Sequence, residues 1–151
     1  MEFAQLLVEH GADVNAQDKY NSTPLHEVLK GRHVKFVQLP VEDGTDLSAQ
    51  GNNKSAPLDV PILTRHVALA WLLIRHGAGV NAQDRYKSTP LHIASKDGYV
   101  EFVRLLVRCG ADVNARNSGK STPLHIASLG GHVEFARLLV EHGAEVNAQD
   151  D

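Results

Sequence analysis

The stretch Thr89-Pro90-Leu91-His92-Ile93-Ala94 decides the fold, because the same six residue types return 33 residues later, at 122–127. The first four of them also stand at 23–26. The same interval continues along the rest of the chain. Its proline recurs as Pro24, Pro57, Pro90 and Pro123, and a glycine recurs as Gly11, Gly44, Gly77, Gly110 and Gly143. No insertion or deletion breaks this phase, so the chain reads as an array of 33-residue units.

The first helix of each unit is marked at both ends, as the unit at 84–116 illustrates. Thr89 can cap the helix by accepting a bond from a free backbone N–H. Pro90 follows at the first helical position, where its missing N–H does no harm. Gly98 is the residue type that stops such a helix.

A second helix is expected over about 100–108, because Phe102, Leu105 and Leu106 fall on one apolar stripe. Each helix then has about eight residues, well below the ~12–15 at which an isolated helix is even marginal in water. Neighbouring units must therefore stack in order to bury their stripes.

With this period and the full word at 89–94 and 122–127, the chain resembles the ankyrin-repeat family over its whole length. The resemblance implies an all-α fold, an ankyrin-repeat solenoid of stacked helix-turn-helix pairs with β-turn tips. We expect one domain over 1–151. It divides into a half repeat at 1–17, repeats at 18–50, 51–83, 84–116 and 117–149, and the start of a further repeat at 150–151.

Both ends of this chain fall inside the repeat pattern. Terminal repeats normally carry a polar outer face. Apolar residues that look like interior positions stand at the two ends instead, namely Phe3, Leu6, Leu7, Phe135, Leu138 and Leu139. Two readings stay open: a segment of a longer array or a self-associating chain whose ends stack, and a slightly frayed monomer.

The repeat pattern weakens in the first two complete units. Pro40 falls inside a second helix, and Pro61 follows Pro57 so closely that the first helix there should be distorted or start late. Elsewhere in these units Arg32 and Arg65 replace the helix-ending glycine, Ala56 replaces the capping threonine and Asp59 replaces the histidine. We expect about 34–64 to be the softest part of the stack, through either drift or specialised recognition.

Composition excludes several classes of protein. A net charge of −3 gives no overall positive field, so we expect no binding to nucleic acid or to membrane. The longest apolar run, at 67–74, is too short to span a bilayer, and residues 1–10 lack the basic region of a secretory signal. A single cysteine, Cys109, suits a reducing compartment, so the expected location is intracellular, cytoplasmic or nuclear.

Catalytic and metal-binding motifs are not expected. The nine histidines fall on repeat positions one unit apart, too far apart to share the ~2 Å ligand shell of a metal. Gly119-Lys120-Ser121-Thr122 mimics the end of a phosphate-binding loop, but Asn114 stands where that loop needs glycine. Cys109 has no partner pattern for nucleophilic catalysis. We therefore expect no enzyme activity, no metal and no cofactor.

The resemblance implies a partner protein held on a concave face of turn tips and first helices. Carried over by position, the tips supply Lys19, Tyr20, Ser22, Asn52, Asn53, Ser55, Arg85, Tyr86, Ser88, Ser118, Gly119 and Ser121. The first helices supply Lys30, Leu63, Thr64, Lys96, Asp97 and Leu129. Tyrosine and arginine are favoured at the centres of interfaces, so Tyr20 and Tyr86 are the leading candidates.

The tips also form a basic ridge of Lys19, Lys54, Arg85, Lys87 and Lys120. Such a ridge favours an acidic or phosphorylated protein segment, although turn lysines that merely face solvent explain it as well. Lysine stands where the family has a turn glycine in three tips, namely at Lys54, Lys87 and Lys120, and Asn21 stands there in the first tip. The sequence leaves open whether that position keeps a positive φ.

Four loop asparagines resemble those of ankyrin repeats that are hydroxylated on asparagine, namely Asn15, Asn81, Asn114 and Asn147. Hydrogen bonds from these side chains to the loop backbone would account for them without any modification.

Overall fold

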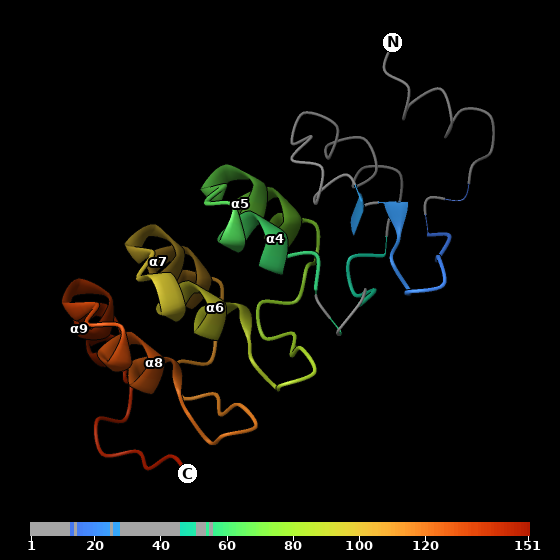
Figure 1. The fold of residues 1–151 in the computed structure, drawn as a ribbon. Coiled ribbons are helices and arrows are strands. Elements are labelled where there is room, and N and C mark those ends of the chain that lie inside the picture. Colours follow the sequence, from blue (N-terminus) through green and yellow to red (C-terminus); the bar gives the residue numbers. More distant parts are fainter. Residues whose placement is uncertain (1–12, 14, 25, 28–45, 51–53, 55) are drawn as a thin grey trace.

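A computed structural model describes residues 13, 15–24, 26–27, 46–50, 54 and 56–151. Within them the elements are α4 (Asp59–Leu63), α5 (Val67–Arg75), α6 (Pro90–Asp97), α7 (Val100–Arg108), α8 (Pro123–Leu129) and α9 (Val133–Glu141), and this part of the chain holds no strand. The helices pair and stack in single file, with α4, α6 and α8 in one layer and α5, α7 and α9 in the other (Figure 1). This confirms the predicted all-α solenoid.

The first helices begin as the sequence predicts. Thr89 has extended backbone angles, and its N–H donates to Nδ1 of His92 at 3.1 Å. Because Nδ1 accepts that proton, the neutral ring carries its own proton on Nε2, which donates to the carbonyl of Ser121 at 3.1 Å. Burial lowers the pKa of His92, which favours this neutral form. The histidine thus caps its own helix and also ties it to the next repeat.

The second helix of the third unit runs from Val100 to Arg108, as predicted. Its buried stripe is Phe102, Val103 and Leu106, while Leu105 is only partly buried. Gly98 ends the preceding helix with a φ of +67°, a left-handed conformation that glycine adopts without strain.

The core is a continuous strip between the two helix layers. In the described part, the main helix contacts lie within a pair or between adjacent pairs. The largest side chains in it are fully buried, among them Leu58, Leu73, Phe102 and Phe135.

The apolar residues near the C-terminal end are interior positions, as they look in the sequence. Phe135, Leu138 and Leu139 are buried, because the stripe of α9 packs inward against α7 and α8. Phe3, Leu6 and Leu7 lie outside the described residues. Other side chains, described below, therefore make the exposed C-terminal surface.

Helix α4 starts late, as Pro57 and Pro61 predict. It begins at Asp59, two residues beyond the helix start marked by Pro90 in the next repeat, and it has five residues. No side chain caps it at Leu58. Residues 34–45, 51–53 and 55 of the expected soft region lie outside the described residues, so its softness stays a prediction.

None of the helices in the described residues is both long and apolar enough to cross a membrane.

Candidate binding surface: the turn tips

The first, third and fourth tips are each closed by one side chain, as the third tip illustrates. Oδ1 of Asp84 accepts the N–H groups of Tyr86 and Ser88, both at 2.8 Å. Two backbone bonds of 3.0 Å complete the turn, from Asp84 N–H to Ser88 O and from Lys87 N–H to Asp84 O. Asp18 and Asn117 make the same side-chain bonds in the first and fourth tips. These three tips are therefore defined turns of one type.

The turn position at which the family has glycine keeps a positive φ, although no glycine stands there in this chain. Lys54 and Lys87 have φ of 57°, Lys120 has 56° and Asn21 has 60°. The turn has therefore not changed type, which settles the question that the sequence left open. A left-handed conformation costs an ordinary residue roughly 1–2 kcal/mol, so each lysine adds a charge to its tip at some expense of stability.

Adjacent repeats are joined along the tips by hydrogen bonds. Ser118 N–H donates to the carbonyl of Tyr86 at 2.8 Å, and Asp151 N–H makes the equivalent bond to Gly119 at 3.3 Å. Asn114 spans two repeats, donating to the carbonyl of Gly143 at 3.0 Å and accepting the Glu145 N–H at 2.8 Å.

Asn81 makes the same pair of bonds one repeat earlier. Asn15 likewise accepts the N–H of Asp46 at 2.6 Å. The loop asparagines therefore bond the backbone as expected, and the row of tips is held in register.

Two tips present matching pairs of a cation and a tyrosine. Tyr20 and Tyr86 are each 55% exposed. Nζ of Lys19 lies 5.0 Å from the centre of the Tyr20 ring, and the guanidinium carbon of Arg85 lies 4.5 Å from the centre of the Tyr86 ring. Arg85 also donates to the Tyr86 hydroxyl. Both rings thus offer an exposed apolar surface held by a cation.

The predicted partner-binding residues fall into three groups. Ten are exposed: Lys19, Tyr20, Leu63, Arg85, Tyr86, Lys96, Asp97, Ser118, Gly119 and Leu129. Thr64, Ser88 and Ser121 are partly buried, and Ser22 is buried with 4% exposed. Ser22 therefore drops out of the accessible surface. Lys30, Asn52, Asn53 and Ser55 lie outside the described residues.

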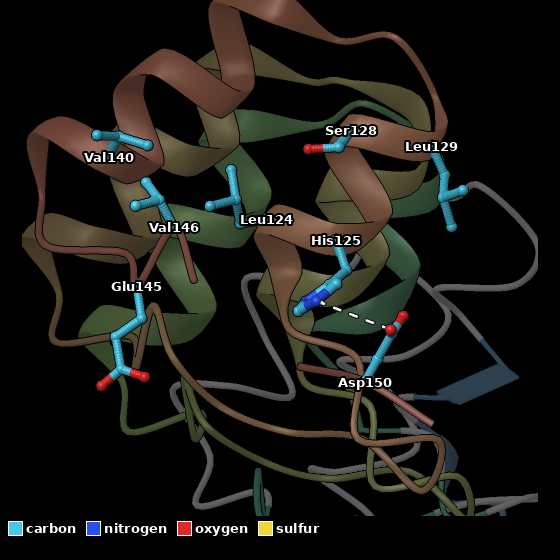
Figure 2. Close-up of a pocket in the computed structure, with 8 residues that line it drawn as sticks. All are labelled: Leu124, His125, Ser128, Leu129, Val140, Glu145, Val146 and Asp150. Atoms are coloured by element: carbon cyan, nitrogen blue, oxygen red, sulfur yellow. Dashed lines mark ion pairs between the residues drawn. The ribbon is translucent and has the colours of Figure 1, made fainter. Parts of the chain in front are cut away.

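A second surface lies at the C-terminal end of the stack. A hollow of about 560 Å³ lies there, lined by Leu124, His125, Ser128, Leu129, Val140, Glu145, Val146 and Asp150. Figure 2 shows these side chains. Nε2 of His125 lies 4.0 Å from a carboxylate oxygen of Asp150. The hollow is apolar on one side and carries this polar pair on the other.

The residues of this hollow could have been found from the sequence by comparison with the preceding repeat. Leu91, His92 and Ser95 stand one repeat before Leu124, His125 and Ser128, and all three are buried where α8 packs on α6. The same residue types lose that cover at α8. Aligning interior positions across repeats, instead of inspecting the apolar stripe of the last helix, would have found these residues.

The histidines of the repeat word make local hydrogen bonds wherever they are described. The rings of His26, His92 and His125 each contact Thr N–H and Oγ1 within their own repeat word. Among the described residues no group of three or more His, Cys, Asp or Glu side chains could hold a metal ion. Cys109 is partly buried.

A family model described as ankyrin repeats, in three copies, matches residues 1–84 and again 66–150. No curated protein matches the sequence significantly. The two matched ranges together cover nearly the whole chain, and they agree with its 33-residue period and stacked helix pairs. The chain belongs to the ankyrin-repeat family.

Proposed function

We propose that this chain binds a partner protein through its turn tips and the adjoining ends of its first helices. Ankyrin repeats are generally protein–protein interaction modules and are typically non-enzymatic. The observation that carries the proposal is the repeated pair of a cation on a half-exposed tyrosine, at Tyr20 and Tyr86. Aromatic rings and arginine dominate the energetics of many interfaces.

The tips also support a partner of acidic character. Lys19, Lys54 and Lys87 are exposed, and together with Arg85 they place positive charge along one edge of a chain whose net charge is −3. At the fourth tip Lys120 pairs with Asp151, so the basic character is strongest on the first three. We propose an acidic or phosphorylated segment as the partner's contact, steered by this charge.

A pull-down with the wild-type chain and with Tyr20→Ala/Tyr86→Ala tests this function. Loss of specifically recovered partners, with an unchanged free energy of unfolding, is the expected result, because neither ring fills the core. Val133→Ala is the matched control, since it also removes an exposed apolar side chain but lies in α9. Equal recovery by the double variant and the wild type would refute the role of the tips.

The end hollow favours a second candidate function, self-association through the ends of the stack. Leu129 and Val146 are 86% and 65% exposed. The hollow lies on the side of α8 that corresponds to the side of α6 covered by α8. Burying such apolar surface against the helices of a second copy would stabilise an end-to-end dimer.

Sedimentation velocity over a concentration series tests this candidate, with Leu129→Lys/Val146→Lys as the variant. We expect a mass that rises with concentration in the wild type and a monomer in the variant. A wild-type monomer at every concentration excludes self-association, and it leaves the tip proposal intact because that proposal rests on Tyr20 and Tyr86, which lie outside the end hollow.

A further inference from the structure

The outer helices α5, α7 and α9 carry exposed side chains at equivalent positions, and in α9 the arginine at these positions is paired with acidic side chains. Arg137 contacts Glu134 through Nε at 3.0 Å, and it contacts Glu141 through a terminal nitrogen at 3.2 Å. The guanidinium therefore lies between two carboxylates of its own helix.

Helix α7 keeps the arginine and loses one of the acids. Arg104 stands one repeat before Arg137, but Arg108 stands at the place of Glu141. Both arginines are exposed, and the described residues place no carboxylate within ion-pair distance of either one. Glu101 is the only acid on the exposed side of this helix.

Helix α5 places an aromatic ring at the same position. Trp71 stands one repeat before Arg104 and is 49% exposed. Arg75 stands one repeat before Arg108, and its guanidinium carbon lies 5.2 Å from the centre of the Trp71 ring. An exposed tryptophan held by a cation has no counterpart at this position in α7 or α9.

These side chains meet at a hollow between two neighbouring helices. Its volume is about 380 Å³, and it is lined by Trp71, Glu101, Arg104, Leu105, Arg108 and Cys109. Helices α5 and α7 lie side by side in the outer layer (Figure 1). Leu105 and Cys109 are partly buried, so an apolar floor lies beneath a rim that is mostly cationic.

We propose that this outer basic patch, formed by Trp71, Arg75, Arg104 and Arg108, binds an acidic peptide segment with an apolar side chain inserted beside Trp71. Charge complementarity supports this occupant, because two guanidinium groups and one carboxylate line the hollow, and a third guanidinium, that of Arg75, lies against the Trp71 ring. Guanidinium groups bind carboxylates through paired hydrogen bonds. The Trp71 ring and Leu105 supply the apolar contact. No tip residue takes part, so this surface is independent of the proposed function.

A protein segment fits the patch better than a nucleic acid does. Single-stranded nucleic acids need a basic groove that follows the backbone, with several aromatic rings for the bases. Here the basic stripe ends at α9, where Glu134 and Glu141 neutralise Arg137. The patch also offers a single ring.

Fluorescence of the full chain tests the proposal directly, because Trp71 is the only tryptophan. The probe is a synthetic peptide of glutamates around one leucine, titrated against the chain at low salt. A blue shift of the Trp71 emission is expected, since the leucine excludes water from the ring. Arg104→Glu/Arg108→Glu should weaken this binding at least about tenfold, because reversed rim charges repel the peptide.

Three controls make the result decisive. The same peptide with glutamines in place of glutamates should leave the emission unchanged, and Arg104→Lys/Arg108→Lys should retain part of the affinity. Tyr20→Ala/Tyr86→Ala should respond as the wild type does, which separates this patch from the tips. The proposal is overturned if the glutamate peptide causes no shift up to about 1 mM, if charge reversal leaves the affinity unchanged, or if an oligonucleotide shifts the emission and the peptide does not.

Discussion

Arg65 and Gly98 occupy the same place in successive repeats and solve one backbone requirement in two ways. Both have a positive φ, 61° and 67°. A side chain at Gly98 would collide with His132, since a Cβ there would lie 2.5 Å from the ring. In the preceding repeat Tyr99 replaces that histidine, and the Arg65 guanidinium carbon lies 4.2 Å from the centre of its ring. The cation–π contact offsets part of the strain at Arg65.

Asp59 similarly replaces the histidine of the repeat word and keeps half of its function. Its Oδ2 accepts the N–H of Ala56 at 2.8 Å, as His92 accepts the N–H of Thr89. Unlike the histidine, a carboxylate is charged at neutral pH, and this one is 94% buried, with 6% exposed. Burial, with a smaller contribution from the charge of Asp84, raises the pKa of Asp59 to about 7, although the hydrogen bond from Ala56 N–H favours the charged form.

Stability should therefore depend on pH through Asp59. The folded chain holds the proton to about pH 7, while the unfolded chain releases it near its ordinary value of 3.8. The stabilising contribution is complete below about pH 4 and is lost as the pH rises through 7. Its size is at most roughly 4 kcal/mol, because each pKa unit corresponds to about 1.4 kcal/mol.

Asp59→Asn checks this expectation, since asparagine keeps the oxygen that accepts the Ala56 N–H but cannot titrate. Urea unfolding at about pH 5 and about pH 8 should show a fall in the free energy of unfolding for the wild type that is much smaller in the variant. Asp97→Asn, at an exposed position, is the control and should keep the wild-type slope. Equal slopes for wild type and Asp59→Asn would contradict the assignment.

Lys87→Gly should stabilise the fold. The residue has a φ of 57°, which costs lysine about 1–2 kcal/mol and glycine almost nothing, although glycine gains more freedom in the unfolded chain. The expected net gain is about 0.5–1 kcal/mol in the free energy of unfolding, measured by urea titration. Lys96→Gly in α6 provides a control of opposite sign, since glycine inside a helix costs about 1 kcal/mol. A loss of stability at Lys87 would mean that its side chain makes a contact stronger than the backbone strain.

At the scale of elements, the repeat word fixes the ends of a helix wherever it is intact. Val100 to Arg108 was predictable to the residue, because Gly98 and Gly110 delimit it and Phe102 and Leu106 set its buried face. The altered word at 56–59 predicted a late start for α4. It could not predict that Asp59 would take over the bond to the backbone, because that depends on how deeply the turn is buried.

The amides of α4 should exchange faster than those of α6 and α8. Helix α4 has five residues and no side-chain cap, so fewer bonds must break to open it. Hydrogen exchange followed by mass spectrometry measures this difference. Ala56→Thr with Asp59→His restores the word Thr-Pro-Leu-His at 56–59 and should slow exchange in α4. Protection of α4 equal to that of α6 and α8 in the wild type would refute the expectation.

At the scale of the whole molecule, the linear order of contacts explains what sequence can and cannot foresee. The period predicts which helices pack together, because the main helix contacts join neighbouring units in the described residues. It does not predict that Trp71 would stand beside Arg104 and Arg108. That arrangement depends on the neighbour across the interface, which a residue's own repeat does not contain.

The same linear order predicts that equivalent mutations act differently along the stack. Phe102 and Phe135 are equivalent and both fully buried, so replacing either with alanine removes about 3–5 kcal/mol of packing. Helix α7 packs on both α5 and α9, whereas among the described helices α9 packs only on α7 and α8. Phe135→Ala should therefore release α8 and α9 in an early step, and the other helices should unfold later. Phe102→Ala should lower the stability of α5, α7 and α9 together.

Hydrogen exchange resolved by helix, across a urea series, distinguishes the two patterns. If Phe135→Ala speeds exchange equally in α4 and α9, the array behaves as one cooperative unit and the nearest-neighbour description fails.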